Sequence, residues 1–265
     1  QYVVKKNKVS VADKKKKLYN RVMDEKRITT DQTTIRINKY LSAAGVCSRR
    51  EADQLTDAGR VTVAGKEIGT GERIPADAEV FLDGRPVKAE TRQVLLLFYK
   101  PRGIVCSTKK QRQETTVTEF LDYPVRVYPV GRLDKDTTGL LLLTNDGALA
   151  HDLLSPKKHV DKTYRVRPGK PLSAEDIHRL ESGLEIGDDK PTAPAKAVLT
   201  EDGDLLLTIH EGRFHQVKRM LQAIGNQVLT LERIRFGSLS LDPALSRGDY
   251  RALTEEEIKH LRIKE

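Results

Sequence analysis

The chain has 265 residues, a formal net charge of +9 and a mean hydropathy of −0.52, which together indicate a soluble protein of one or two domains. No apolar run is long enough to span a bilayer, and the charged N-terminal segment lacks the apolar stretch of a secretory signal. The two cysteines, Cys47 and Cys106, are far apart in the sequence, which argues against a disulfide scaffold or a zinc ribbon and favours the reducing cytoplasm.

Residues 1–34 are rich in lysine and poor in apolar side chains. Their cations outnumber their carboxylates by six, so only +3 of the net charge remains on the rest of the chain. This composition is typical of a flexible basic arm that can contact phosphates, and equally of a spacer. A basic chain favours a polyanionic partner such as nucleic acid, but the net charge alone says little about the folded part.

Residues 35–88 are predicted to form a small domain that begins with two helices. Apolar residues recur at helical spacing in the first helix, which ends at Gly45. Ser48 and Glu51 have the spacing of a capping box, in which each side chain binds the backbone amide of the other residue. This box predicts the start of a second helix.

Two short strands are predicted after these helices, over residues 60–66 and 78–82. Several cations lie in or beside the pair of helices. A solvated basic helix face is common in proteins, so the cations by themselves do not establish a binding surface. Those that we single out are Arg36, Lys39, Arg49, Arg50 and Arg60.

After a short linker, residues 93–263 are predicted to alternate strands and helices. Strands outnumber helices, and Asp202-Gly203 predicts a hairpin. The pattern favours an α+β domain with a mixed, mostly antiparallel sheet. The strands are predicted at 94–99, 125–130, 140–144, 163–167, 195–200, 204–210 and 228–235, and the helices at 116–121, 148–154, 173–182, 214–224 and 254–261.

Asp134 lies in a polar loop between two predicted buried strands. The first strand ends at Gly131, and the second is the wholly apolar run that follows Gly139. Two rigid strands hold a short loop in a fixed geometry, as a reactive carboxylate requires. Most loop aspartates only cap turns or helices, however, and we expect that role for Asp136 and Asp146.

The predicted helix over residues 214–224 supplies a possible partner for Asp134. Phe214, Val217, Leu221 and Ile224 fall on one face at 100° per residue, and we expect them to be buried. Lys218 projects close to this stripe, where an unpaired ammonium would be costly. Lys218 therefore needs a carboxylate partner, and Asp134 is a candidate, although structural salt bridges of this kind are common.

Three ordered motifs resemble one family of enzymes. The motifs are Gly131-Arg132-Leu133-Asp134 with Thr137 and Gly139-Leu140-Leu141, then Lys162-Thr163-Tyr164, then Glu211-Gly212-Arg213 with His215-Gln216-Val217-Lys218-Arg219-Met220. Residues 36–41 and 47–52 resemble an S-four-type RNA-binding domain. From about residue 35 to about residue 261, the chain thus resembles the RsuA/RluB/RluE/RluF-type ribosomal RNA pseudouridine synthases.

The resemblance implies a role for each motif. Asp134 matches the catalytic aspartate, Tyr164 the tyrosine that stacks on the target uracil, and Lys218 the basic residue that pairs with the aspartate. Arg132 matches an arginine that contacts RNA around the flipped base. We further predict RNA contacts by Arg213 and Gln216 of the third motif and by the cations of the first domain.

Conversion of uridine to pseudouridine breaks the N1–C1′ bond and forms a C5–C1′ bond. No group is lost and no redox change occurs, so we expect no cofactor. The six histidines show no ligand spacing, so we expect no metal. A carboxylate can attack a sugar or base carbon, or remove the C2′ proton, and the sequence leaves these routes open.

Two other functions remain open at this point. One is a non-catalytic RNA-binding or ribosome-assembly protein, which the presence of Asp134, Tyr164 and Lys218 argues against. The other is a DNA-binding regulator, for which no helix-turn-helix pattern stands out. We expect the partner to be ribosomal RNA or a ribosome-assembly intermediate, and the protein to be monomeric. Residues 105–108, 215–220 and 248–254 favour the small ribosomal subunit, whereas residues 36–52 look closer to the large-subunit enzymes.

Overall fold

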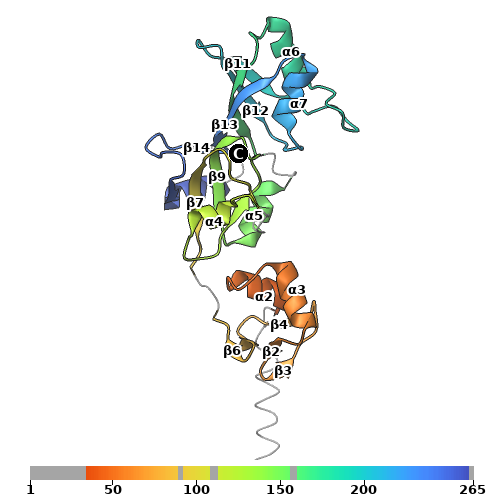
Figure 1. The fold of residues 1–265 in the computed structure, drawn as a ribbon, viewed down its shortest axis with the longest axis vertical. Helices are drawn as coiled ribbons and strands as arrows, with labels where there is room; N and C mark the ends of the chain where they lie inside the picture. The colour runs from red at the N-terminus through yellow and green to blue at the C-terminus, as the bar shows by residue number, and fades with distance from the viewer. Residues whose placement is uncertain (1–33, 89–91, 108–112, 156–159, 263–265) are drawn as a thin grey trace, which may run out of the picture. The chain divides into compact units, whose positions relative to one another are not determined.

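The computed structural model describes residues 34–88, 92–107, 113–155 and 160–262 (Figure 1). The predicted basic arm, apart from Thr34, lies outside the described residues. The described residues separate into two compact units, divided after Lys88, which we describe one at a time. No helix in the described ranges is both long and apolar enough to cross a membrane.

The first unit packs two helices on short strands, as the sequence predicts. The predicted capping box is present, because the Ser48 hydroxyl accepts from the Glu51 amide at 3.2 Å and the Glu51 carboxylate accepts from the Ser48 amide at 2.7 Å. Ile37, Leu41 and Val61 are fully buried in its core. The elements are β1 (Thr34–Arg36), α2 (Ile37–Ala43), α3 (Arg49–Asp57), β2 (Val61–Val63), β3 (Lys66–Glu67), β4 (Arg73–Pro75), β5 (Val80–Leu82) and β6 (Arg85–Pro86).

The second unit is built on one nine-stranded sheet of order β11-β12-β10-β13-β9-β7-β15, with β8 also on β9 and β14 on β13. Every pairing is antiparallel except that of β9 with β13, so the predicted mixed sheet is confirmed. The strands are β7 (Leu95–Lys100), β8 (Tyr128–Val130), β9 (Thr138–Thr144), β10 (Lys162–Pro168), β11 (Lys196–Leu199), β12 (Leu205–Ile209), β13 (Val228–Phe236), β14 (Leu239–Ser240) and β15 (Tyr250–Ala252).

Both faces of the central strands are covered, which explains why β7 and β9 are almost wholly apolar. Leu141 and Leu143 of β9 enter one core cluster, and Leu140 and Leu142 enter another. Helices α4, α6 and α7 contribute to the first cluster, and α5 and α8 to the second. The helices are α4 (Val117–Leu121), α5 (Gly147–Leu154), α6 (Ala174–Ser182), α7 (Gln216–Ala223) and α8 (Glu255–Arg262).

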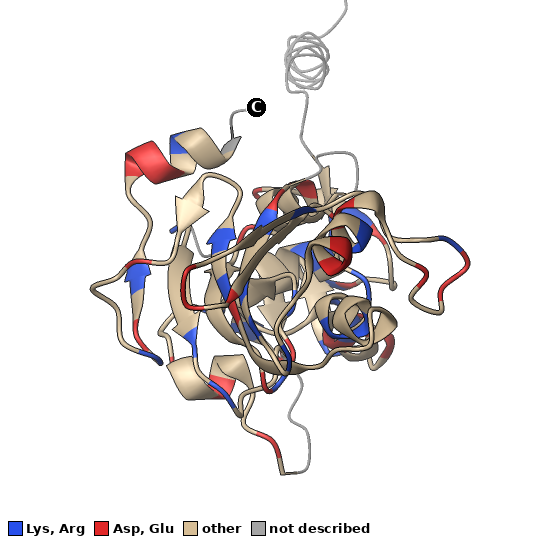
Figure 2. Cartoon of the chain, turned by 90° about the horizontal axis from the view of Figure 1, so that it is seen from above, with Lys and Arg blue, Asp and Glu red and all other residues tan. Residues whose placement is uncertain are grey.

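The predicted helix starts are confirmed at several places. Thr116 and Ser173 form capping boxes at α4 and α6, and Asp146 accepts from two amides at the start of α5. Thr254 and Glu257 exchange hydrogen bonds at the start of α8. The first turn of α8 is acidic (the red turn near the C-terminal end in Figure 2), as the positive end of a helix dipole favours.

Two predicted elements begin later than expected. The strand predicted from residue 125 starts at Tyr128, because the chain bends at Pro124. The helix predicted from residue 214 starts at Gln216, because His215 has left-handed backbone angles (φ 48°, ψ 33°). Phe214 is consequently 68% exposed, so the prediction that it is buried in the helix stripe was wrong.

Candidate active site

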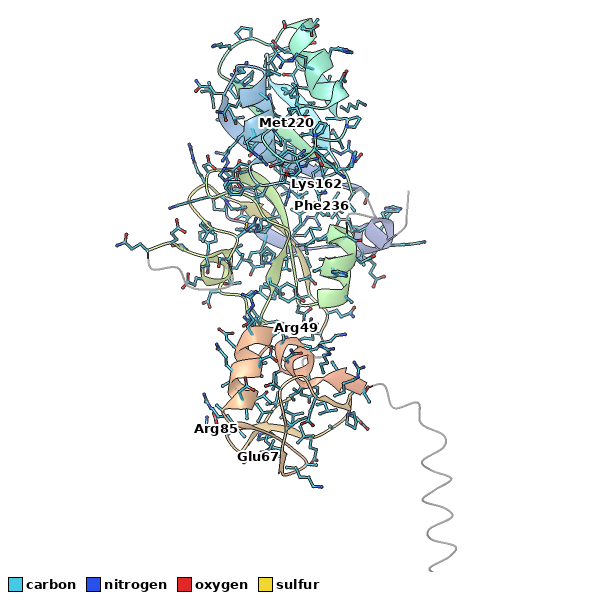
Figure 3. The ribbon with its side chains drawn as sticks, turned by 90° about the vertical axis from the view of Figure 1, so that its right-hand side faces the viewer. Arg49, Glu67, Arg85, Lys162, Met220 and Phe236 are labelled. Carbon is cyan, nitrogen blue, oxygen red and sulfur yellow. The ribbon has the colours of Figure 1, made fainter. Side chains whose placement is uncertain are left out.

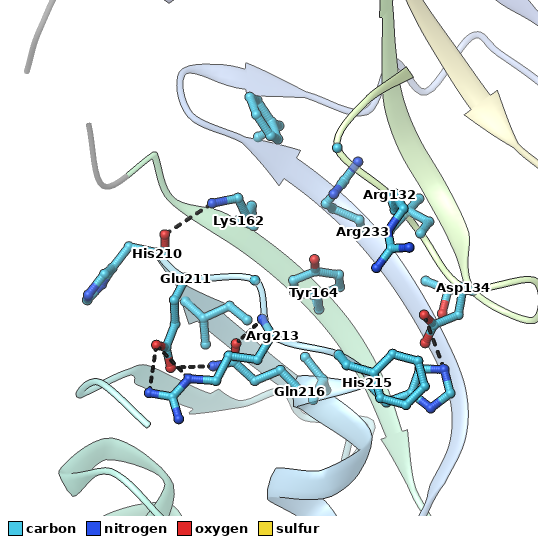
Figure 4. A pocket seen from close by; sticks show the side chains of 18 of the residues that line it. Arg132, Asp134, Lys162, Tyr164, His210, Glu211, Arg213, His215, Gln216 and Arg233 are labelled. Carbon is cyan, nitrogen blue, oxygen red and sulfur yellow. Dashed lines mark hydrogen bonds and ion pairs between the residues drawn. The ribbon is translucent and has the colours of Figure 1, made fainter. Parts of the chain in front are cut away.

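A cavity of about 670 Å³ opens in the second unit, a volume in the range that small ligands occupy (Figure 4). Strands β10 and β13 supply part of its wall. Residues 131–134 supply another part, and residues 209–218, which lead from β12 into α7, supply a third. The three motifs singled out in the sequence therefore meet at one cavity.

The loop that carries Asp134 is fixed by its backbone oxygens. Lys100, at the end of β7, is fully buried, and its ammonium donates to the carbonyls of Asp134 at 3.1 Å and Thr137 at 2.8 Å. The amide of Gly103 donates to the Lys135 carbonyl at 2.7 Å. Burial lowers the pKa of Lys100. Sequence analysis missed this lysine, although a charge that ends an otherwise apolar strand is a detectable signal.

Asp134 and Lys218 form the predicted ion pair. The Lys218 ammonium lies 2.9 Å from Asp134 Oδ2 and 2.6 Å from Asp136 Oδ1. Burial alone would lower the pKa of Lys218, but its bonds to Asp136 and Asp134 outweigh that effect and raise it. Asp136 was expected only to cap a turn, whereas it shares the cation of Asp134, so that expectation was incomplete.

His215 reaches Asp134 from the other side. Its Nε2 lies 3.5 Å from Asp134 Oδ1, and its ring stacks on Phe214 with 3.8 Å between ring centroids. Left-handed backbone angles are uncommon outside glycine, and at functional sites they often serve to aim a side chain. Periodicity could not reveal this contact, because it assumes that the helix continues through residue 215.

Tyr164 and Arg132 both line the cavity. Tyr164 is 8% exposed and lies on β10 between Leu207 of β12 and Arg233 of β13. Its ring occupies the space between Lys162 and Asp134, with Arg132 close by (Figure 4). The catalytic and base-contacting residues implied by the resemblance are thus brought together.

Arg213 and Gln216 instead brace the segment that leads into α7. Arg213 donates to Glu211 and to the carbonyls of Lys190 and Pro191. Gln216 is 4% exposed, accepts from the Arg213 amide at 2.9 Å and donates to Glu211 at 2.7 Å. Both line the cavity, but their polar groups already have protein partners, so RNA contacts by them stay a prediction.

The predicted RNA-contacting cations of the first domain are all exposed, and none lines the cavity. Arg49 and Arg50 open α3, and Arg36 and Lys39 lie at the start of α2. Arg60 differs from these, because its guanidinium forms a two-pronged ion pair with Asp83 at 2.8 and 2.5 Å. No three potential metal-ligating side chains gather anywhere in the described ranges.

Comparison with known proteins gives the site a context. The RNA pseudouridylate synthase family matches residues 94–223, and the S4 domain matches residues 35–80. The uncharacterized RNA pseudouridine synthase YtzG of Bacillus subtilis is 46% identical over 84% of this chain and 97% of that protein. Ribosomal large subunit pseudouridine synthase B of Bacillus subtilis is 41% identical over 86% of this chain and 95% of that protein.

Ribosomal small subunit pseudouridine synthase A of Yersinia pestis is 40% identical over 84% of this chain and 97% of that protein. A crystal structure of a pseudouridylate synthase superposes with a TM-score of 0.65 at 35% identity, covering 86% of this chain and 99% of that one. The cavity holds a carboxylate, Asp134, that is paired with Lys218, and Tyr164 lines the same cavity. Together with an S4 domain on the same chain, these features define an RNA-modifying enzyme. The chain belongs to the RNA pseudouridine synthase family, whose members isomerise uridine to pseudouridine, as the sequence motifs predicted.

Proposed function

We propose that this enzyme isomerises a uridine of ribosomal RNA, with Asp134 as the catalytic carboxylate. The observation that carries the proposal is the placement of Asp134 at the wall of the cavity, between Lys218 and His215 and beside Tyr164. The Lys218 ammonium, 2.9 Å away, holds this carboxylate in place, and a carboxylate can attack carbon or remove a proton.

Tyr164 provides an aromatic ring on which the target uracil stacks. A target uridine must leave its stack to reach the cavity, which costs a few kcal/mol. Stacking on an aromatic ring recovers about 1–3 kcal/mol of that cost. Arg132, exposed beside Tyr164, is placed to contact the RNA around the flipped nucleotide.

The bonds balance without a co-reactant. The N1–C1′ bond breaks, the uracil turns, and C5 bonds to C1′ while its proton leaves to solvent and N1 gains one. Covalent attack on the sugar or base and removal of the C2′ proton all begin at the same carboxylate. Asp134 serves each of these routes.

Relatives at 41% and 40% identity are named for the large and the small ribosomal subunit, which supports ribosomal RNA as the substrate. Residues 105–108, 215–220 and 248–254 favour the small subunit. We accordingly expect small-subunit RNA, or a precursor particle that contains it, as the partner, and the cytoplasm as the compartment. Mapping carbodiimide-induced stops of reverse transcription in wild-type and deletion strains identifies the uridine.

Release of tritium from C5-labelled uridine tests the reaction, with ribosomal RNA from the deletion strain as substrate. We expect release by the wild type, none by Asp134→Asn, and wild-type release by Asp202→Asn, a matched change at an exposed hairpin carboxylate. If the wild type binds the RNA but releases no tritium, the chain is a non-catalytic RNA-binding protein. If Asp134→Asn still turns over, the assignment of the carboxylate is wrong.

A further inference from the structure

Two cations, Lys162 and Arg233, line the cavity near Tyr164 (Figure 4). Lys162 begins β10 and Arg233 lies within β13, and both contact the ring of Phe236 (Lys162 and Phe236 are labelled in Figure 3). The Lys162 ammonium is 5.8 Å and the Arg233 guanidinium carbon 5.4 Å from that ring centroid. Two positive charges therefore share one aromatic ring at the inner wall of the cavity.

Arg233 is poorly satisfied for a buried cation. Its side chain is 2% exposed, and its Nε donates to the Leu140 carbonyl at 2.8 Å, while one terminal nitrogen has no partner among the described residues. A buried guanidinium that lacks a hydrogen bond costs free energy. Such a group points to a ligand that supplies the missing acceptor.

Lys162 is in a similar state. Its ammonium donates to the carbonyls of Val160 at 2.6 Å and His210 at 3.1 Å, which leaves one of its three hydrogens. Burial, followed by repulsion from Arg233, lowers the pKa of Lys162 to about 8, although Asp161 acts in the opposite direction. An anion between the two cations would relieve this repulsion.

The protein does not provide that anion. The cavity is lined by two carboxylates, Asp134 and Glu211, which already bind Lys218 and Arg213. Across the described ranges of the chain, no carboxylate forms an ion pair with Lys162 or Arg233. Because uracil is neutral, the complementary charge on the substrate must come from its backbone.

We propose that Lys162 and Arg233 form a binding site for the phosphodiester that flanks the target uridine. The inference rests on the proposed function, since it names a subsite for the same substrate. A guanidinium and an ammonium provide several charge-assisted donors, which suit the oxygens of a phosphate. Each uridine in RNA has a phosphate on either side of its ribose, so an anion enters the cavity together with the base that stacks on Tyr164.

Titration with uridine 3′,5′-bisphosphate and with uridine tests this site without turnover and without knowledge of the target. The affinity ratio of the two ligands, measured by nuclear magnetic resonance, isolates the contribution of phosphate. We expect the wild type to prefer the bisphosphate by about tenfold or more, which corresponds to two charge-assisted bonds. We expect Lys162→Gln to lose most of that preference.

Lys196→Gln is the matched control, because Lys196 is exposed on β11 and does not line the cavity. The Lys196→Gln variant should keep the wild-type ratio of affinities for the bisphosphate and for uridine, whereas Lys162→Gln should lower that ratio. Arg233→Lys keeps the charge but loses the fork of the guanidinium, so its ratio should fall between the two. Thermal unfolding of each variant shows whether it is folded.

Equal ratios for the wild type, Lys162→Gln and Lys196→Gln would overturn the phosphate site. That result is distinct from failure of the proposed function, which appears as absence of tritium release by the wild type.

A second measurement identifies the phosphate. One methylphosphonate placed 5′ or 3′ of the mapped uridine should slow the wild type about tenfold at one of these linkages, and should not slow Lys162→Gln further. Additive losses at both linkages would also overturn the proposal.

Discussion

Under the two proposals above, two sets of charges at the cavity act on different parts of a nucleotide. Lys218 lies between the carboxylates of Asp134 and Asp136, so that set carries a net negative charge. Lys162 and Arg233 form the second set, which is positive. Tyr164 lines the same cavity (Figure 4). Under these proposals, the substrate meets a carboxylate and a pair of cations in the same cavity.

The stability of the protein should depend on the proton of Lys162. Its pKa is about 8 in the folded protein and about 10.4 in an unfolded chain. The folded state thus binds the proton more weakly, so stability rises with pH between these two values. The Val160 and His210 carbonyls, the Phe236 ring, Arg233 and Asp161 act on the ammonium, and we attribute the shift to burial and Arg233, which outweigh Asp161.

Urea unfolding of the wild type and of Lys162→Gln at pH 7.5 and 9.5 measures this effect. The wild type should gain stability relative to the variant at the higher pH, because comparison with the variant removes the contribution of other groups. A difference that is the same at both pH values would show that Lys162 keeps an ordinary pKa.

At the scale of elements, the parallel pairing of β9 with β13 joins the two halves of the sheet. Gly139 has φ 109°, and a Cβ there would lie 2.2 Å from the Arg233 carbonyl oxygen and 2.5 Å from its amide nitrogen. Neither backbone atom can move without breaking the pairing of the two strands. Only glycine fits this position, which lies between the Asp134 loop and the apolar part of β9.

Gly139→Ala should therefore destabilise the protein by about 3 kcal/mol or more, from steric overlap together with an unfavourable φ. Gly203→Ala is the control, because Gly203 has φ 77° but open space around its Cβ position. That variant should lose only about 1 kcal/mol. Chemical denaturation compares the two, and similar losses would mean that β13 shifts to make room.

Most elements could be predicted from local sequence. Capping boxes such as Ser48 with Glu51 are short-range patterns, and the apolar runs of β7 and β9 reflect burial on both faces. Helical spacing and the cost of a buried charge indicated that Lys218 has a carboxylate partner, and the resemblance then singled out Asp134 among the candidates. Contacts that depend on distant segments did not follow, since spacing along one segment does not identify what faces it.

The features of the site that the sequence did not predict depend on contacts between distant segments or on a local break in the helix. Lys100 binds carbonyls of a loop more than thirty residues away, and Arg233 is buried within a strand whose pattern does not reveal the cavity. His215 leaves the helical spacing because its backbone is left-handed. The resemblance to a family supplied Tyr164, which no periodicity would have distinguished from an ordinary strand tyrosine.

For the whole molecule, six of the nine net positive charges lie in residues 1–34, so RNA binding by the S4 domain should depend on its individual exposed cations and not on its net charge. Replacement of both Arg49 and Arg50 by Ala removes two exposed cations at the start of α3. We expect weaker RNA binding. Each phosphate contact contributes about 0.7–0.9 to the slope of log affinity against log salt concentration, so the loss of two contacts should make this slope shallower by about 1.4–1.8.

Arg60→Ala is the informative comparison, because Asp83 already neutralises Arg60. Its effect on the salt slope should be smaller than that of either Arg49→Ala or Arg50→Ala. Binding measured between 50 and 200 mM salt, about the range over which such contacts lose most of their strength, tests both statements. An unchanged slope in the double variant would exclude this surface as the contact with RNA.

The position of β9 also has a consequence for motion. This strand is buried along its whole length and is paired on both edges, by β7 on one side and by β8 and β13 on the other. Backbone amides in such a strand exchange with solvent only when the whole unit opens, whereas the edge strand β11 can open locally. The Asp134 loop leads directly into β9, so its geometry should persist through every fluctuation short of global unfolding, and hydrogen exchange should find residues 140–143 among the slowest in the chain.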